Sequence, residues 1–487
     1  MKFPLFVNGA YRSQSPIADD EQTINWLPEQ MESEGATTKV ALYPSPGVSL
    51  FATVTESSGG RAAFSMDGRC FLVIGSKFVE LLFDGTYTVR GSVSVGLSPA
   101  TISSNGELGG ELFITSGGSP GVGGKGYTYD LATNTLTETV ASGCVMGGMS
   151  YGYFWYLDDT SVFHISDIND GLTWDPLQIG TRSISPDPTI ALLVTSYGQT
   201  WLLGEQSTEV WYNAAVDPFP FVPDASGNIP YGIAAVFSVA EANEAVTWLA
   251  TTRDGGYQVM SAQGLTPQRI SDFALEYEFS TYTTVADAMG ETYREAGHTF
   301  YVLTFPSENK TWVFDFSTGK WHRRGTWVSE VSEWREWRPT WHCFAFGKHL
   351  FCDRESGAIY EVSNEFAVDV EDRPLRRVRR SPTLTSDGNM VRFSKLEIAL
   401  EVGLGTATGQ GVNPTVTLRY SDDGGKMWSN ELTATAGAMG RYQTRVTFWC
   451  LGQSRARTFE VSVTDPIAWR ITDAYVLGRV TQPGMAA

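Results

Sequence analysis

The stretch Ser421-Asp-Asp-Gly-Gly-Lys-Met-Trp428 fits the pattern S-x-D-x-G-x-x-W, which is typical of a tight turn between two β-strands. Gly425 can take a positive φ at no steric cost. Ser421 and Asp423 carry short polar side chains that can accept hydrogen bonds from the backbone amides of the turn itself. Trp428 is expected to fold over the turn. The stretch therefore predicts a β-hairpin, and it assigns these four residues a structural role.

A weaker copy of this pattern lies earlier, at Asp167-Ile-Asn-Asp-Gly-Leu-Thr-Trp174. Asp167 and Asn169 replace the serine and the aspartate, whereas Gly171 and Trp174 are kept. The residues before each copy, 162–165 and 416–420, read as strands, with apolar residues alternating along the second run. Both copies are therefore expected to close strands of a sheet.

The same pattern occurs in the Asp-box of sialidases, so a glycosidase has to be weighed. Sialidases also share an early Arg-Ile-Pro stretch, an arginine triad and a Tyr-Glu pair, and the nearest match to the first is Arg269-Ile-Ser271, late in the chain. A carbohydrate-binding protein is a second alternative. Four tryptophans that could serve as sugar platforms fall inside strand runs, where core positions are more common: Trp155, Trp201, Trp211 and Trp248.

Composition favours an all-β chain. The 487 residues include 50 glycines and 13% aromatic residues, and short runs of Val, Tyr, Trp and Phe alternate with Gly, Asp and Ser clusters. Helical periodicity is almost missing, and the best candidates for a short helix are residues 273–277 or 285–293. The chain is long enough for one large β domain with a smaller one attached.

Strand-turn-strand units recur at about the length of a propeller blade. The seven candidate units are residues 61–94, 100–140, 145–179, 190–212, 235–270, 284–327 and 341–362. This spacing predicts a β-propeller of six to seven blades over residues 61–365, with residues 1–60 as a leader and propeller-closing segment. Residues 383–487 read as a C-terminal β-sandwich, because alternating strands continue there after a basic connector at 366–382.

Charge is unevenly distributed along the chain. Residues 366–487 hold 15 Lys and Arg against 12 Asp and Glu, a net charge of +3, so residues 1–365 hold the remaining 20 against 42, a net charge of −22. The acidic part disfavours tight binding to DNA, because such binding requires a basic surface. It is also compatible with a role in solubility alone.

The connector carries a run of five arginines, and it is expected to interrupt the strand pattern. These are Arg373, Arg376, Arg377, Arg379 and Arg380. They are candidates for a DNA phosphate contact or for a subunit contact. The second interpretation, in which the connector pairs with the acidic propeller of its own or of a neighbouring subunit, is favoured by the charge balance.

Neither metal nor cofactor is expected. Five cysteines form no C-x-x-C pair, and five histidines show no metal-ligand spacing. The thiols are expected to be reduced in a protein made in the cytoplasm, although a two-residue turn at Gly347-Lys348 would place Cys343 opposite Cys352 and allow a disulfide. The N-terminal apolar run is too short for a signal-peptide core, and no run reaches the length of a membrane span.

Four segments resemble a known family. Residues 22–29 (QTINWLPE), 42–47 (LYPSPG), 166–170 (SDIND) and 418–425 (LRYSDDGG) are similar to the packaged-DNA stabilisation proteins of short-tailed bacteriophages, which form the tail hub or nozzle. The resemblance implies a β-propeller body without catalytic residues or cofactor, located in the virion tail and synthesised in the host cytoplasm.

The resemblance also implies a set of partners. A homohexamer would dock below the portal-adaptor protein and continue the channel through which double-stranded DNA passes without sequence-specific contact. Tail spikes or fibres, and a tail needle or plug, would attach to it. The alternatives are a tail glycosidase and a carbohydrate-binding β-propeller that act on host surface polysaccharide.

Overall fold

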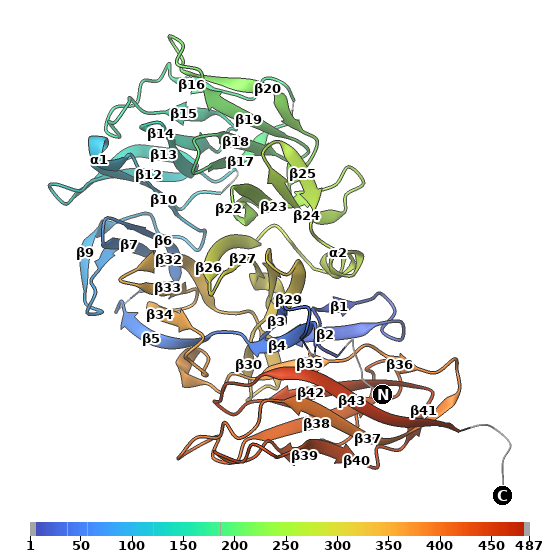
Figure 1. Ribbon diagram of the computed structural model, residues 1–487. Helices are drawn as coiled ribbons and strands as arrows, with labels where there is room; N and C mark the ends of the chain where they lie inside the picture. Colours follow the sequence, from blue (N-terminus) through green and yellow to red (C-terminus); the bar gives the residue numbers. More distant parts are fainter. Residues whose placement is uncertain (1–5, 37, 56, 120, 186, 482–487) are drawn as a thin grey trace, which may run out of the picture.

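The computed structural model describes residues 6–481 apart from residues 37, 56, 120 and 186, so the ends of the predicted leader and sandwich lie outside the described residues. The chain is a β-propeller joined to a β-sandwich, which confirms the predicted fold class (Figure 1). Helices in the described part of the chain are short. They are α1 (Gly106–Gly109), α2 (Phe273–Ser280) and the 3₁₀ turns η1 (Val236–Ser238), η2 (Pro306–Glu308) and η3 (Val370–Asp372).

Seven blades form the propeller, and each contains strands of one of the seven units predicted from the sequence. The fourth strands of blades 4 and 7 lie outside the predicted units 190–212 and 341–362. Blade 1 contains β6 (Gly60–Met66), β7 (Arg69–Ile74), β8 (Lys77–Leu81) and β9 (Tyr87–Ser92). Blade 2 contains β10 (Thr101–Ser104), β11 (Glu111–Ser116), β12 (Gly124–Asp130) and the first half of β13 (Thr135–Ser150). Blade 3 contains the second half of β13 with β14 (Tyr153–Asp158), β15 (Phe163–Ile165) and β16 (Ile179–Gly180).

Blades 4 to 6 follow in chain order. Blade 4 contains β17 (Thr189–Val194), β18 (Thr200–Gly204), β19 (Thr208–Asn213) and β20 (Phe221–Ile229). Blade 5 contains β22 (Ala240–Ala242), β23 (Ala245–Thr251), β24 (Tyr257–Gln263) and β25 (Thr266–Arg269), and β21 (Gly232–Ile233) pairs with β23. Blade 6 contains β26 (Met289–Glu295), β27 (His298–Phe305), β28 (Lys310–Asp315) and β29 (Lys320–Arg324).

Blade 7 takes its last strand from the other end of the chain. Its strands are β32 (Pro339–Ala345), β33 (Lys348–Asp353), β34 (Ala358–Ser363) and β5 (Gly47–Thr53), and β5 pairs antiparallel with β34. The small hairpin of β30 (Thr326–Val328) and β31 (Glu333–Arg335) precedes this blade. Because β6 of blade 1 packs against β32 of blade 7, the ring closes at this seam.

Aromatic side chains fill the spaces between blades. Trp201 of blade 4 and Trp248 of blade 5 are fully buried, with ring centroids 6.0 Å apart. Trp155 and Trp211 are also buried, so the four tryptophans of the strand runs are core residues, as predicted. Strands such as β7 are buried along nearly their whole length because a neighbouring blade covers each face.

The C-terminal domain consists of two facing sheets. One contains β35 (Arg377–Arg380), β42 (Ala456–Val463), β38 (Thr415–Ser421) and β39 (Leu432–Thr435), and β36 (Leu384–Thr385) pairs with β42. The other contains β43 (Ile471–Thr481), β37 (Met390–Leu400) and β40 (Val446–Trp449), and β41 (Gln453–Ser454) pairs with β37. Their inner faces share one apolar core.

The leader connects the two domains. It contains β1 (Tyr11–Arg12), β2 (Asp20–Ile24), β3 (Trp26–Gln30) and β4 (Val40–Pro44). Strand β2 pairs in parallel with β29 of blade 6 and antiparallel with β35, so one continuous sheet runs from the propeller into the sandwich. Neighbouring residues of β3 face opposite ways: Trp26 lies in the sandwich core and Leu27 in a propeller core.

One of the two predicted helices forms. Helix α2 begins at Phe273, and the side chain of Asp272 accepts a hydrogen bond from the amide of Leu275 as its N-cap. The alternative helix at residues 285–293 is wrong, because Met289–Glu295 forms strand β26 and pairs along its whole length with β27.

Candidate functional site at the domain junction

The arginine run is part of a sheet. The prediction that it interrupts the strand pattern is wrong, because Arg377–Arg380 forms β35 between β2 of the leader and β42 of the sandwich. Side chains alternate across this strand, so Arg377 and Arg379 point to one face and Arg380 to the other. The side chains of Arg377 and Arg379 are buried, with 1% and 0% exposed surface.

Arg379 is enclosed by the leader. Its guanidinium forms an ion pair with Glu21, which is itself 3% exposed. It also donates to the hydroxyl of Thr23 at 2.8 Å and to the carbonyl oxygens of Phe6 and, at 3.2 Å, Gly9. A buried guanidinium needs such acceptors because it loses its hydration on burial. Arg379 therefore holds residues 6–9 and strand β2 against the connector.

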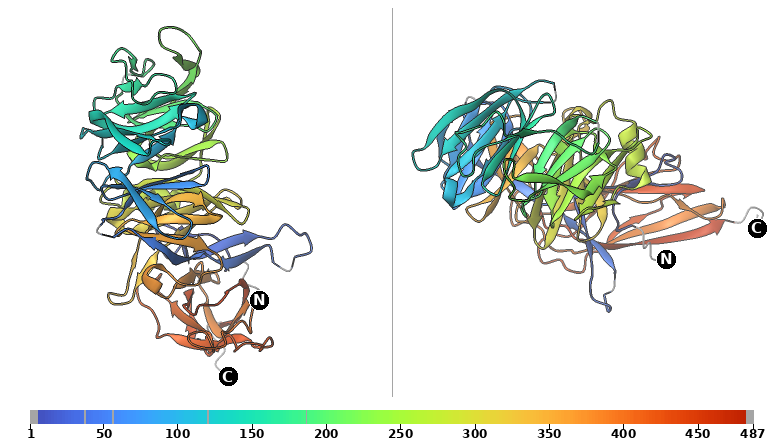
Figure 2. Two further views of the ribbon diagram at one scale, coloured as in Figure 1. Left: turned by 90° about the vertical axis from the view of Figure 1, so that its left-hand side faces the viewer. Right: turned by 90° about the horizontal axis from the view of Figure 1, so that it is seen from above.

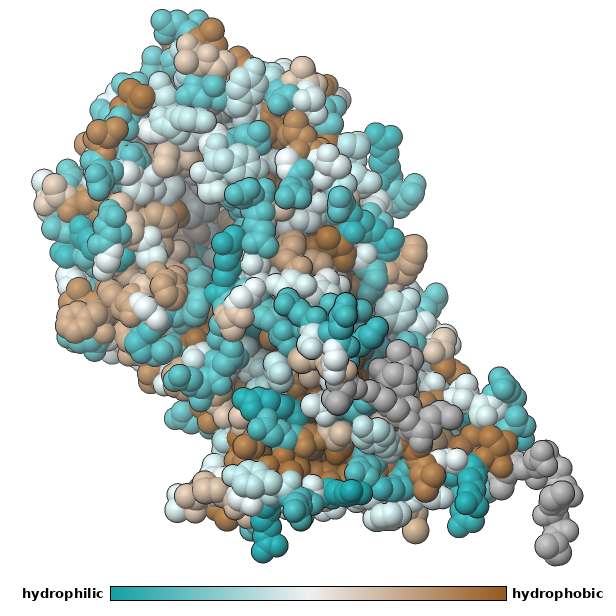
Figure 3. Space-filling view, viewed as in Figure 1, coloured by the Kyte–Doolittle hydropathy of each residue, from teal (hydrophilic) through white to brown (hydrophobic). Residues whose placement is uncertain are grey.

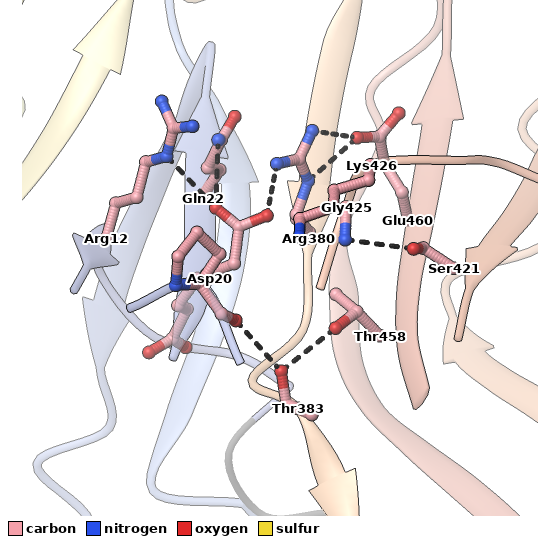
Figure 4. A network of polar contacts seen from close by, with 12 residues as sticks. Arg12, Asp20, Gln22, Arg380, Thr383, Ser421, Gly425, Lys426, Thr458 and Glu460 are labelled. Carbon is pink, nitrogen blue, oxygen red and sulfur yellow. Dashed lines mark hydrogen bonds and ion pairs between the residues drawn. The ribbon is translucent and has the colours of Figure 1, made fainter. Parts of the chain in front are cut away.

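Arg380 bridges the leader and the sandwich on the opposite face of β35 (Figure 4). It donates to Asp20 at 2.5 Å and to Glu460 of β42 at 2.7 and 3.0 Å. Arg419 of β38 donates to the other carboxylate oxygen of Glu460 at 2.6 Å, and Arg12 lies 3.2 Å from Asp20. Five charged side chains from five strands thus form one network across the junction.

The other arginines of the run have separate surroundings. Arg373 pairs with Glu371 and Glu330 on the surface. Arg376 lies over the ring of Trp327, 4.1 Å from its centroid. Burial lowers the pKa of Arg377 to about 10. The proposed DNA contact does not hold for Arg377 and Arg379, because both side chains are buried within their own chain.

The Ser421–Trp428 turn has the hydrogen bonds that its sequence predicts. The hydroxyl of Ser421 accepts from the amide of Gly425 at 2.9 Å. One carboxylate oxygen of Asp423 accepts from the amides of Lys426 and Met427, each at 3.0 Å, and from the hydroxyl of Ser421 at 2.7 Å. The hydrogen bonds from Met427 and Ser421 lower the pKa of Asp423. These contacts tie the side chains of Ser421 and Asp423 to the backbone of the turn.

Trp428 connects this turn to the charged network. Its indole donates to the carbonyl oxygen of Gly425 at 3.1 Å, so the ring folds back over the turn. The guanidinium groups of Arg380 and Arg419 lie 4.8 and 4.7 Å from its ring centroid, close enough for cation–π attraction. The turn therefore packs on the network through Trp428.

The second turn, at residues 167–174, shares only part of this geometry. Trp174 donates to the carbonyl oxygen of Gly171 at 2.9 Å, as Trp428 does to Gly425. The capping carboxylate is that of Asp170, which accepts from the amide of Leu172 at 2.9 Å, and not a side chain at the predicted positions Asp167 and Asn169. The backbone of Asn169 instead takes a positive φ of 56° in this turn.

A cavity of about 710 Å³ lies on the propeller axis. Its lining comes from inner strands of the blades and includes Ala62, Thr101, Ser150 and Trp341. None of the described lining residues is an Asp or Glu, so this cavity does not offer the carboxylate pair of a glycosidase. Glu241 lines a second pocket that shares Ser196 with this cavity, and Ser196 donates to both carboxylate oxygens of Glu241.

The hairpin does not place Cys343 opposite Cys352, so the alternative disulfide between them does not form. The hairpin turns at Phe346-Gly347, one residue earlier than predicted, so Cys343 lies opposite Leu350, and Cys352 lies opposite Thr340. Cys343 instead contacts Cys70 of blade 1, with 3.5 Å between the sulfur atoms. Within the described residues, no group of three or more His, Cys, Asp or Glu side chains could hold a metal ion, and no helix could span a membrane.

These observations define a β-propeller and a β-sandwich that are joined by a shared sheet and a charged network. Family models identify this class: residues 1–367 match the β-propeller of bacteriophage P22 Gp10, and residues 376–478 match its β-sandwich. The chain therefore belongs to the bacteriophage P22 Gp10 family, the tail hub proteins of short-tailed phages, and is a structural tail protein by family. The second match begins at residue 376, which places β35 with the sandwich.

Similar solved structures are distant. Virginiamycin B lyase from Staphylococcus aureus is 11% identical, with 65% of this chain and 99% of that chain covered and a TM-score of 0.43. BamB from Moraxella catarrhalis is 11% identical, with 69% and 96% covered and a TM-score of 0.38. Likenesses at this level carry no inference about function. No curated protein matches the chain.

Proposed function

We propose that this protein forms a homohexameric tail hub, or nozzle, below the portal-adaptor protein, where it seals packaged DNA and conducts it during ejection. The observation that carries the proposal is the match of both domains, in order and in one chain, to a single family of phage tail proteins. The other partners in this proposal are tail spikes or fibres and a tail needle or plug. The proposed role is structural and involves no catalysis.

The junction suits a ring subunit. A subunit that contacts its two neighbours through different surfaces must hold those surfaces in a fixed relation if the ring is to close. Strand β2 gives the propeller and the sandwich a common sheet. The ion pair of Arg379 with Glu21 holds β35 against β2, and that of Arg380 with Glu460 holds β35 against β42. We therefore expect the two domains to move as one body.

Exposed features offer contacts to neighbouring proteins. The hairpin of β3 and β4 stands out from the body of the molecule (Figure 2), and residues 32–35 near its tip are exposed. Hydrophilic residues cover most of the face seen in Figure 3, with apolar residues in scattered groups. In the sandwich, Trp449 of β40 and Leu477 of β43 are 62% and 51% exposed. We expect such exposed apolar groups to be buried in the assembled tail.

The charge distribution suits the passage of DNA. Residues 1–365 carry a net charge of −22, which six copies would raise to −132. Carboxylates that face the channel would repel phosphates and let DNA slide. At physiological ionic strength this repulsion reaches only about 8 Å, so only carboxylates on the channel wall would contribute.

A deletion strain tests the proposal. Particles assembled without this protein are expected to package DNA and then to lose it, and wild-type protein supplied from a plasmid is expected to restore stable, DNA-filled capsids. Imaging the complemented particles should place six copies below the portal adaptor. Stable DNA-filled capsids in the deletion strain would refute the sealing role.

A further inference from the structure

Three buried cysteines lie together where the first and last blades meet. Cys70 is in β7 of blade 1, and Cys343 and Cys352 are in β32 and β33 of blade 7. All three belong to one apolar cluster, in which their exposed fractions are 0%, 5% and 0%. The propeller ring closes at this seam, so a covalent bond between Cys70 and a cysteine of blade 7 would join the two ends of the blade series.

One pair in this cluster is in direct contact. The sulfur atoms of Cys70 and Cys343 are 3.5 Å apart, although 273 positions separate the two residues in the chain. A disulfide bond is about 2.05 Å long, so the two sulfurs would need to approach by about 1.5 Å. Cys352 lies in the same hairpin as Cys343 but opposite Thr340, two residues away from a direct pairing position in the ladder.

The backbone at the seam keeps the two blades close. A Cβ atom added to Gly60 of blade 1 would lie 2.1 Å from the Cβ of Cys352, and one added to Gly59 would lie 1.6 Å from the carbonyl oxygen of Arg354. Glycine is therefore required at both positions for this approach. Strand β32, which carries Cys343, also contacts β7, which carries Cys70, so the two thiols can meet through small side-chain movements.

We propose that Cys70 and Cys343 form an oxidation site, at which a small peroxide converts the two thiols into a disulfide that closes the propeller ring covalently. The thiols would stay reduced in the host cytoplasm and would be oxidised after the particle leaves the cell. This timing rests on the proposed place of the protein in the virion tail, whereas the pairing itself does not.

The reaction balances with hydrogen peroxide as the oxidant. Peroxide oxidises the sulfur of Cys343, the more exposed of the two, to a sulfenic acid; the O–O bond breaks and one water is released. The sulfur of Cys70 then attacks the sulfur of Cys343, so the S–S bond forms and the S–OH bond breaks. The hydroxide leaves with the proton of Cys70 as a second water. The hydrogen bond to Cys343 and burial raise the pKa of Cys70, so the reaction is expected to be slow.

Peptide mapping of the purified full-length protein tests the pairing. After incubation with hydrogen peroxide, non-reducing mass spectrometry is expected to show a peptide that joins Cys70 to Cys343, with Cys144, which is buried elsewhere, still a thiol. The Cys343→Ala variant should lack this peptide, and the Cys352→Ala variant should retain it. A Cys343–Cys352 linkage would overturn the proposal, and so would unmodified Cys70 and Cys343 in a sample whose exposed Cys450 is oxidised.

A melting experiment tests the consequence. Oxidation is expected to raise the melting temperature of the wild-type protein by about 5 °C or more, reversibly by dithiothreitol, because the bond closes a long loop in the unfolded chain. The Cys343→Ala variant should show no such rise, whereas the matched control Cys144→Ala should retain it. An equal rise in Cys343→Ala would overturn the proposal. Both assays use isolated protein, so their results do not depend on whether the protein seals DNA.

Mapping of particles prepared without reductant tests the timing. The Cys70–Cys343 peptide is expected in released particles and not in protein taken from the host cytoplasm under thiol-blocking conditions. Reduced thiols in released particles would refute oxidation after release, even where the purified protein forms the bond.

Discussion

Replacing Arg379 by alanine tests whether the arginine run acts as a clamp within the chain. The substitution leaves the carboxylate of Glu21, which is 3% exposed, without its cation, and it removes donors from the carbonyl oxygens of Phe6 and Gly9. Breaking a buried ion pair by removing one partner costs about 3–5 kcal/mol. We expect Arg379→Ala to lower the free energy of unfolding of the junction by this amount.

The matched control is Arg373→Ala. Arg373 belongs to the same run, but its side chain is 30% exposed and its partners Glu371 and Glu330 are 47% and 68% exposed. Exposed pairs of this kind contribute about 0–1 kcal/mol. The comparison therefore separates the effect of burial from the loss of one positive charge. A double variant, Glu21→Gln with Arg379→Met, should recover part of the loss, because it leaves no unpaired buried charge.

Urea unfolding, monitored by tryptophan fluorescence and by proteolysis of the leader, is the appropriate measurement. The protein has two domains, so the free energy should be taken from the transition in which the leader becomes accessible to protease. Equal stability of Arg379→Ala and Arg373→Ala would refute the clamp. Weaker binding to duplex DNA in Arg379→Ala, with stability unchanged, would instead support a DNA contact.

Three further outcomes are expected. Asp423→Ala should lower the melting temperature of the sandwich without changing any activity, because two turn amides lose their acceptor, and a loss of glycosidase activity at unchanged stability would contradict this role. The hydrogen bond to Asp315 raises the pKa of His298, which also contacts Glu29 of the leader, so its stabilisation should be full below about pH 6.5 and should be lost as pH rises through the raised pKa. Urea unfolding at pH values on either side of this range should show a stronger pH dependence of the unfolding free energy in wild type than in His298→Gln, and equal slopes in the two proteins would exclude the contribution of His298. Isolated wild-type protein should not bind duplex DNA in a gel-shift assay at about 150 mM salt, and salt-sensitive binding would overturn the intrachain role of the arginines.

Local patterns predicted the blades well. Residues 284–327 become blade 6, and residues 190–212 supply the first three strands of blade 4, because each strand pairs with its neighbour in sequence across a short turn. The partners of the leader could not be predicted in the same way. Strands β2 and β5 lie within the predicted leader and propeller-closing segment, and a local pattern carries no information about their partners β35 and β34, which lie more than 300 positions away.

The arginine run shows why the junction was only partly predictable. Arg377 and Arg379 are two residues apart, which is the spacing of one face of a strand, and this was the available signal for β35. Five arginines nevertheless favour an exposed segment, since charged residues are rarely buried without partners. The partners Glu21 and Glu460 come from opposite ends of the chain, and only the folded structure brings them together.

The turn expected at Gly347-Lys348 lies one residue earlier in the structure. Phe346 and Gly347 both take positive φ, at 57° and 75°, as a two-residue hairpin turn requires. The glycine suggested a turn at Gly347-Lys348, because phenylalanine rarely takes such a φ. Moving a turn by one residue moves every cross-strand partner by two, which replaced Cys352 by Leu350 as the partner of Cys343.

Strand β5 has a consequence for synthesis on the ribosome. It is made among the first residues of the chain, and its partner β34 emerges about 300 residues later. At a synthesis rate of about 5–20 residues per second, the edge of β5 stays unpaired for roughly 15–60 seconds. During this interval it can pair with the edge of another nascent chain, since exposed strand edges are templates for pairing. We therefore expect crowded polysomes to favour entangled or aggregated products, and slow expression to favour soluble subunits with a closed ring of blades.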